Sequence, residues 1–218
     1  MSITNMIGDF FLWGFAFIFS TTVHEASHGY VAKLGGDLTA YSAGQVSLNP
    51  LPHIKREPFG MVLFPVLSFI FYGGGWMLGW ASVPYDPAWA ARHPRKSAWM
   101  ALAGPVSNLC IFIVSFLLLK LGLDSGLLIS AADTASVKQT IAELLYIMAQ
   151  LNLILAIFNL IPFPPMDGSE AILLLVPEER ANDFRMKIQS LGMFGFFIAI
   201  VVFSSVYAPI QAFIFQFL

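Results

Sequence analysis

The sequence has little charge and almost no cysteine, and each shortage excludes a class of protein. Only 11% of its 218 residues are charged, against about a quarter in soluble domains, while 57% are hydrophobic and the mean hydropathy is +0.74. The single cysteine, Cys110, excludes an internal disulfide. The net charge of −2 gives no basic surface for nucleic acid. The composition is that of an integral membrane protein.

Charge is scarce along five long stretches of the chain. They are residues 10–32, 58–85, 97–119, 144–166 and 188–218. Each has at least the about 20 residues that cross a hydrocarbon core as a helix. No Lys or Arg precedes Lys33, so the basic region of a cleavable signal peptide is absent. We therefore expect the first apolar stretch to remain in the mature protein.

Residues 58–85 differ from the other stretches because Pro65, Gly73–Gly75 and Pro84 interrupt them. A straight helix would lose backbone hydrogen bonds there, which favours a re-entrant segment that returns to its own membrane face. Nine of the 11 Lys and Arg then face one side, and only Lys120 and Lys138 face the other. If residues 58–85 crossed the membrane fully, Lys and Arg would be divided almost evenly between the two sides. An excess of Lys and Arg on one side is typical of cytosolic loops, which favours the re-entrant segment. We expect four spans with both termini outside; a kinked fifth span is the alternative.

Residues 24–28, His-Glu-Ala-Ser-His, form an HExxH motif near the end of the first apolar stretch. Positions i and i+4 share a helix face, so His24 and His28 offer two nitrogens to one Zn²⁺ while Glu25 reaches a metal-bound water. Ionisable side chains within a membrane are costly and usually functional. The motif indicates metal-assisted peptide hydrolysis, with Glu25 moving the proton from water to the leaving amine. A helix that merely carries two histidines is the other interpretation.

A catalytic zinc site needs a third protein ligand and leaves its fourth position to water. The candidates are His53, Glu143, Asp167 and Glu170. Asp167 is favoured because it follows three prolines at the end of an apolar stretch and precedes Gly168, a composition that allows a sharp turn toward the first helix. Alternatively, Asp167 is the N-cap of a short helix over residues 168–176. Glu170 would then support the site from one turn away.

Residues 37–48 alternate small, β-branched and aromatic side chains around Gly44, and Asn49-Pro50 follows them. This alternation predicts a short β-hairpin or edge ribbon that ends in a turn. A strand beside the active site would pair with an extended substrate through its backbone edge. A plain surface loop is the alternative.

Three motifs, in this order, resemble those of the site-2 protease family of intramembrane zinc metalloproteases. They are His24-Glu25-x-x-His28, a helix opening with Gly104-Pro105-x-x-Asn108, and Asn159-x-x-Pro162-x-Pro164-x-x-Asp167-Gly168. The stretch Asn49-Pro50-x-x-His53 and the lack of a PDZ or CBS domain make the chain look like the short bacterial or archaeal branch. The resemblance covers about residues 10–177.

The resemblance implies a function for each matching residue. One zinc ion would be held by His24, His28 and Asp167, and Glu25 would be the catalytic acid and base. Asn159 would bind the substrate or polarise its carbonyl. Two further candidates for substrate or transition-state support are Asn108 and His53. A buried amide such as Asn108 equally well bonds between helices.

Together these observations predict an all-α membrane protein with about four transmembrane helices, a re-entrant segment and a small β-hairpin near the active site. We expect one domain over residues 1–218, with a three-helix catalytic core at about 7–34, 97–121 and 140–177. The re-entrant region lies at about 58–85 and the C-terminal helix at about 188–217. The even number of crossings brings His28 and Asp167 to one face of the cell membrane, which the charge bias makes cytosolic.

The expected partners are the lipid bilayer and a transmembrane protein or peptide substrate, with no nucleic acid. Such a substrate must unwind locally, because helix carbonyls are already hydrogen-bonded. Two other classes stay open. A membrane zinc transporter would need a polar path to both sides, whereas a non-proteolytic scaffold would have no need of Glu25. The sequence predicts no oligomeric state.

Overall fold

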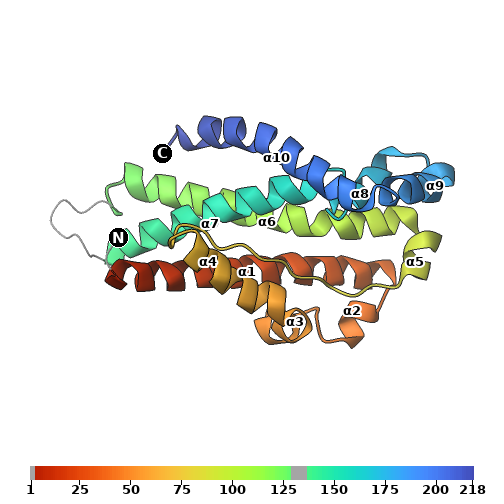
Figure 1. Cartoon of the computed structure of the whole chain (residues 1–218), viewed down its shortest axis with the longest axis horizontal. Helices are drawn as coiled ribbons and strands as arrows, with labels where there is room; N and C mark the ends of the chain where they lie inside the picture. The colour runs from red at the N-terminus through yellow and green to blue at the C-terminus, as the bar shows by residue number, and fades with distance from the viewer. Residues whose placement is uncertain (1–2, 129–136) are drawn as a thin grey trace.

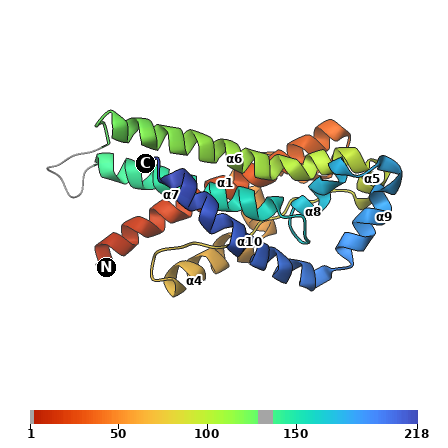
Figure 2. The same ribbon diagram turned by 90° about the horizontal axis from the view of Figure 1, so that it is seen from above.

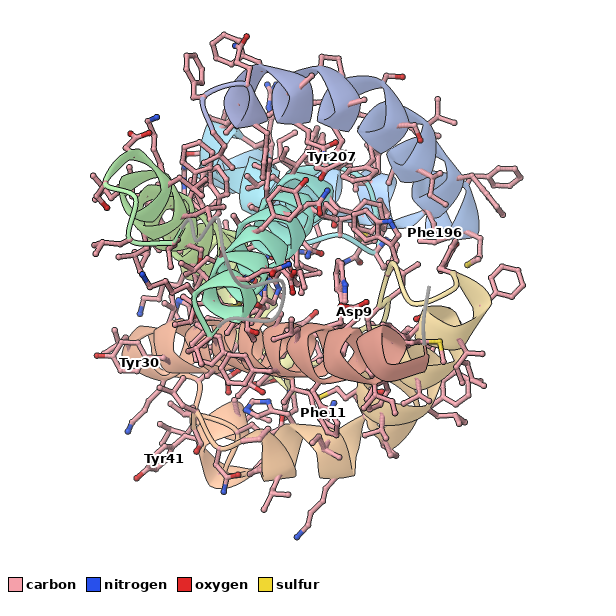
Figure 3. All side chains as sticks on the ribbon, turned by 90° about the vertical axis from the view of Figure 1, so that its left-hand side faces the viewer. Asp9, Phe11, Tyr30, Tyr41, Phe196 and Tyr207 are labelled. Atoms are coloured by element: carbon pink, nitrogen blue, oxygen red, sulfur yellow. The ribbon has the colours of Figure 1, made fainter. Side chains whose placement is uncertain are left out.

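A computed structural model describes residues 3–128 and 137–218, and within these ranges the chain is helical with no β-strand (Figure 1). Four helices are long and apolar enough to cross a membrane, as predicted. They are α1 (Ile3–Gly35), α6 (Pro94–Asp124), α7 (Val137–Leu160) and α10 (Gly192–Phe215). The three helices α1, α6 and α7 pack against one another, whereas α10 lies on the far side of α7 from α1 (Figure 3).

The start of α6 differs from the expectation that a helix opens at Gly104-Pro105. The helix begins at Pro94, whose fixed φ suits a first turn and whose missing N–H is not needed there. Pro105 lies inside α6 and is fully buried. Membrane helices tolerate an internal proline where neighbouring helices pack around it. The motif therefore marks the middle of α6, where this helix meets α1.

The β-hairpin prediction is wrong, because residues 37–48 form the short helix α2 (Thr39–Ser42) and turns. The Asp37 carboxylate accepts hydrogen bonds from the Thr39 amide at 2.9 Å and the Thr39 hydroxyl at 2.5 Å. These bonds start a helical turn in place of a strand. A Cβ on Gly29 of α1 would lie 3.1 Å from the Ala40 side chain, so the segment packs closely on α1.

After α3 (Pro50–Arg56) the chain makes an out-and-back excursion. A π-helical turn, η1 (Phe59–Leu63), leads into α4 (Phe64–Phe71), and the chain then reverses. Gly73 and Gly74 adopt positive φ angles of 64° and 89° at this reversal, a conformation that favours glycine. Residues 76–86, the return leg, run back to α5 (Pro87–Arg92) without forming a helix or strand, as Figure 1 shows. The excursion includes only a short apolar helix, at Phe59–Phe71, and that it re-enters the membrane stays a prediction.

The two legs of the excursion touch through a pair of glycines. The Trp80 amide donates to the Gly60 carbonyl at 3.1 Å. A Cβ on Gly79 would lie 2.2 Å from that carbonyl oxygen and 2.5 Å from the Phe17 ring of α1. No larger residue fits there without displacing backbone, so the return leg is held tightly against α1.

Beyond α7 the chain bends and forms α8 (Gly168–Ala171), the 3₁₀ turn η2 (Ile172–Leu175) and α9 (Glu178–Gln189) before α10. Both termini lie at one end of the bundle, while α5, α8 and α9 lie at the opposite end (Figures 1 and 2). The main apolar core joins α1, α4, the return leg and α7 through Trp13, Phe17, Phe69, Met77, Ile147, Met148 and Leu151.

Candidate metal centre

Three side chains converge between α1 and the bend after α7. His24 and His28 lie one turn apart on α1, and their Nε2 atoms are 3.0 Å apart. The Asp167 Oδ2 atom lies 3.1 Å from His24 Nε2 and 3.3 Å from His28 Nε2. Both histidines are buried and Asp167 is partly buried. Among the described residues, this is the group of His, Cys, Asp and Glu that comes close enough to hold a metal ion.

The hydrogen bonds behind the histidines leave their Nε2 atoms free for a metal. His24 Nδ1 bonds to Asn108 Oδ1 at 2.5 Å, and His28 Nδ1 bonds to the Met100 carbonyl at 2.7 Å. Because these oxygens accept, each Nδ1 carries the hydrogen, and each Nε2 presents a lone pair. Two such lone pairs beside a carboxylate form the donor set of a catalytic zinc site with three protein ligands. The residues therefore fit Zn²⁺.

Gly104 of α6 closes one side of this centre. A Cβ on Gly104 would lie 2.3 Å from His28 Nε2 and 2.6 Å from His24 Nε2. Gly104 is needed because the backbone of α6 lies so close to the two histidine rings that no side chain fits between them. The Gly104-Pro105-x-x-Asn108 motif thus supplies both the close approach of α6 and the hydrogen-bond acceptor for His24.

The bend after α7 directs Asp167 toward α1. A Cβ on Gly168 would lie 2.3 Å from the Leu160 carbonyl oxygen, so the bend folds back onto the end of α7. Asp167 is the N-cap residue of α8, as the alternative interpretation has it, but within the described residues its side chain makes no capping hydrogen bond there and lies against the two histidines. A carboxylate binds a metal in its charged form, and the Asp167 Oδ2 atom is turned toward the Nε2 atoms of both histidines.

A cleft of about 340 Å³ opens beside His28 and Asp167. Glu25, which is only 6% exposed, borders it together with His28 and Asp167. Residues 81–83 and Tyr85 of the return leg also line this cleft. Burial, and then the charge of Glu170, raises the pKa of Tyr85, so its phenol is a hydrogen-bond donor at neutral pH. A larger cavity of about 750 Å³ is lined by other residues of α1 and α6 and includes none of the three ligands.

Glu170 does not reach the three ligands and instead pairs with Arg185 of α9. Arg185 Nε donates to Glu170 Oε2 at 2.9 Å, and Ser97 of α6 donates to Oε1 at 2.6 Å. Arg185 also donates to the Ala90 carbonyl of α5 at 3.2 Å. These bonds join α5, α6, α8 and α9 around the turn that carries Asp167.

The remaining sequence candidates lie outside the cluster. His53 of α3 is 1% exposed, and its Nε2 bonds to the Ser47 carbonyl at 3.0 Å. Glu143 accepts a hydrogen bond from Gln139 near the start of α7, at 3.0 Å. Asn159 donates to the Leu155 carbonyl one turn earlier in α7, at 3.0 Å. Of the four candidates for the third ligand, the structure brings only Asp167 to the two histidines.

Sequence reasoning missed two residues behind His24. Asn108 donates to Asn152 Oδ1 of α7 at 2.7 Å, and Asn152 donates to Ser20 Oγ of α1 at 2.8 Å. All three side chains are fully buried. A signal was present, since Asn152 is a strongly polar side chain in the uncharged stretch 144–166, where an amide needs a partner.

Four spans and a His₂Asp centre with a neighbouring glutamate define a membrane zinc metalloprotease. The model of Peptidase family M50 matches residues 12–203, and the chain belongs to this family, the site-2 protease family. The family and the enzyme class predicted from the motifs are therefore confirmed.

Two curated relatives are similar to the chain. "Putative zinc metalloprotease YwhC" of Bacillus subtilis is 36% identical over 187 residues, which are 85% of this chain and 77% of the relative. "Putative zinc metalloprotease Rip2" of Mycolicibacterium smegmatis is 25% identical over 168 residues, which are 77% of this chain and 58% of the relative. No solved structure matches the chain.

Proposed function

We propose that this protein is an intramembrane endopeptidase that hydrolyses peptide bonds in or near transmembrane segments of membrane proteins. One observation carries the proposal: the cleft that contains Glu25 opens onto His28 and Asp167 within helices apolar enough to span a bilayer. In this proposal residues 1–218 act as one catalytic domain. Its three-helix core is α1, α6 and α7, together with the bend that carries Asp167.

The proposed chemistry assigns one role to each residue. His24, His28 and Asp167 hold one Zn²⁺ per chain, which when bound polarises a peptide carbonyl and acidifies water. Glu25 takes the proton of the attacking water and delivers it to the leaving amine. Its buried position at the cleft supports this role, because a carboxylate there meets little competing solvent. Asn159 is proposed to bind the substrate on the strength of the family motif.

The proposed substrate lies unwound along the return leg. Residues 81–83 belong to neither a helix nor a strand, and they line the cleft together with Glu25. Among the described residues, no other element bonds to the amides of Ser82 and Val83. The Ser82 hydroxyl donates to Glu57 at 2.5 Å, which holds this edge in place. An extended substrate segment would pair with such a backbone edge.

The proposed orientation places the end with α5, α8 and α9 in the cytosol. Lys120 and Lys138 occur near the end of α6 and the start of α7, toward the end with the termini. The other basic residues occur in the last turn of α1, in α3 and α5, at the start of α6 and in α9. Positive charge collects on the cytosolic side of membrane proteins. The active site would then face the cytosolic side of the cell membrane, from which water reaches the cleft.

The experiment that tests the function compares the protein with its Glu25→Gln variant. Both are purified in detergent and incubated with a transmembrane substrate that contains a glycine- or proline-weakened segment. We expect the variant to lose about 10²–10⁴-fold in cleavage rate while it retains zinc, measured by metal analysis. Undiminished cleavage would refute the role of Glu25. Zinc flux into proteoliposomes that survives the substitution would favour a transporter, and neither activity in the unmodified protein would favour a scaffold.

A further inference from the structure

A chain of buried hydrogen bonds runs from the proposed ligand His24 through two helices. His24 Nδ1 bonds to Asn108 Oδ1 at 2.5 Å, Asn108 Nδ2 to Asn152 Oδ1 at 2.7 Å, and Asn152 Nδ2 to the Met148 carbonyl at 2.8 Å. Asn152 Nδ2 also donates to Ser20 Oγ at 2.8 Å. Ser20, Asn108 and Asn152 are 0% exposed, so water does not compete for these bonds.

The Met148 carbonyl, the last group in this series of hydrogen bonds, determines which group donates and which accepts in each bond. The Met148 carbonyl only accepts, so the group of Asn152 that faces it is the NH₂ group. The oxygen of Asn152 then faces Asn108, which must present its own NH₂ group there. The oxygen of Asn108 is left for His24, and it accepts only if His24 Nδ1 carries a hydrogen. Each amide in turn has one orientation that satisfies both of its neighbours.

We propose that Asn152 is a positioning residue for the metal centre, which sets the tautomer of His24 through Asn108. The proposal rests on the proposed function, since it needs His24 to be a ligand. With Asn152 in place, His24 Nε2 keeps its lone pair toward the centre. Without Asn152, the Asn108 amide keeps only the longer contact of 3.5 Å from its Nδ2 to the Ser20 carbonyl. The amide then rotates more easily and offers its NH₂ group to His24, which favours a hydrogen on Nε2 and blocks the metal-facing nitrogen.

The proposal differs from a purely structural role for Asn152 in what it predicts about the metal. A buried amide that only joins helices would change the stability of the fold and leave zinc affinity unchanged. A residue that sets the tautomer of a ligand changes zinc affinity, and loss of such an outer partner typically lowers metal affinity 10–100-fold. The readout is therefore the zinc dissociation constant, which is independent of any substrate.

The experiment measures zinc affinity by competition with a chromophoric chelator in detergent. Asn152→Leu removes both the donor and the acceptor, and we expect its dissociation constant to rise about 10–100-fold. Asn152→Asp is the conservative variant. A buried carboxylic acid in its neutral form donates to Met148 and accepts from Asn108, so we expect a smaller rise than for Leu. Asn152→Ala makes the same test without added volume if the Leu variant does not fold.

Thr22→Val is the matched control on α1. Thr22 is 2% exposed, and within the described residues its hydroxyl has no hydrogen-bond partner, so zinc affinity should not change.

Cobalt in place of zinc adds a second readout, because its visible spectrum reports the donor atoms. We expect this spectrum to change for Asn152→Leu and to be kept by Thr22→Val. A folded Asn152→Leu or Asn152→Ala variant that binds zinc as tightly as the unmodified protein overturns the proposal. If the unmodified protein binds no zinc, the proposed function fails instead.

Discussion

The helices α6 and α10 are both apolar enough to span a membrane, yet they contribute differently to the protein. About 33% of the apolar window of α6 is buried within the protein, against 11% for α10. The buried residues of α10 are Gly195 and Ala199, whereas those of α6 include Ser97, Asn108 and Ser115. Apolar length thus identifies both spans, and only buried polar side chains distinguish the helix that builds the metal centre from the one that faces outward.

The largest expected effect comes from placing a methyl group on α6 against the ligands. In Gly104→Ala, the new Cβ would lie 2.3 Å from His28 Nε2. We expect zinc affinity and peptidase activity to fall by about 100-fold, the upper range for disturbed metal sites. Gly14→Ala on α1 is the control, since a Cβ there meets nothing within 4 Å. Full zinc loading of Gly104→Ala would show that α6 does not limit the space of the centre.

A second large effect is expected where α8 and α9 are held against the core. Arg185→Met leaves the mostly buried Glu170 carboxylate without its charged partner. Removing one member of a buried pair typically costs about 3–5 kcal/mol, and we expect the lower part of that range in the free energy of unfolding in detergent. The double variant Arg185→Met with Glu170→Gln should recover part of this loss. Equal instability of the single and double variants would mean that the pair is not the source.

A substitution in α10 is expected to lower the stability of the protein by a smaller amount and to leave zinc affinity unchanged. In Gly195→Ala, the Cβ would lie 2.8 Å from the Pro164 carbonyl oxygen. Displacing α10 from this contact should cost about 1–3 kcal/mol of stability, as overpacking does, with unchanged zinc affinity. Ser204→Ala on the exposed face of α10 is the control and should stay within about 0.5 kcal/mol. Lower zinc affinity in Gly195→Ala would show that α10 supports the centre, contrary to the comparison with α6.

The smallest effect is a pH dependence outside both helices. Asp37 accepts hydrogen bonds from Thr39 and from the Asp86 amide, at 2.8 Å for the latter. These bonds outweigh the effect of burial and lower the pKa of Asp37 below 3.8. Its contribution to stability is therefore present above pH 3.8 and is lost as the pH falls through the lowered value. The difference in unfolding free energy between the protein and Asp37→Asn should shrink between pH 7 and pH 3; a constant difference would contradict this linkage.

The sequence predicted features that depend on local patterns and missed features that depend on contacts between distant segments. The HExxH spacing and the proline-rich bend before Asp167 are local patterns, so they led to the three candidate ligands that the structure brings together. Residues 37–48 were misread because the pattern of a hairpin does not show the Asp37 hydrogen bonds or the close packing on Gly29. Residues 76–86 form a segment without helix or strand, where glycines, a proline and contacts with α1 decide the conformation.

Asn152 was missed for a different reason. Its importance depends on partners 44 residues away in Asn108 and 132 residues away in Ser20. Periodicity within one helix contains no information about such contacts. A polar side chain in an apolar stretch predicts that some partner exists, but the identity of the partner comes only from the packing of three helices.

The distance along the chain between His24 and Asp167 is 143 residues, and this has a consequence for biogenesis. Contacts between distant parts of a chain form late, because the intervening segments must first be ordered. During synthesis, α1 enters the membrane with both histidines long before Asp167 leaves the ribosome. If these three residues hold the metal as proposed, a nascent chain carries an incomplete ligand set, and the centre is completed only after most of the spans have been synthesised.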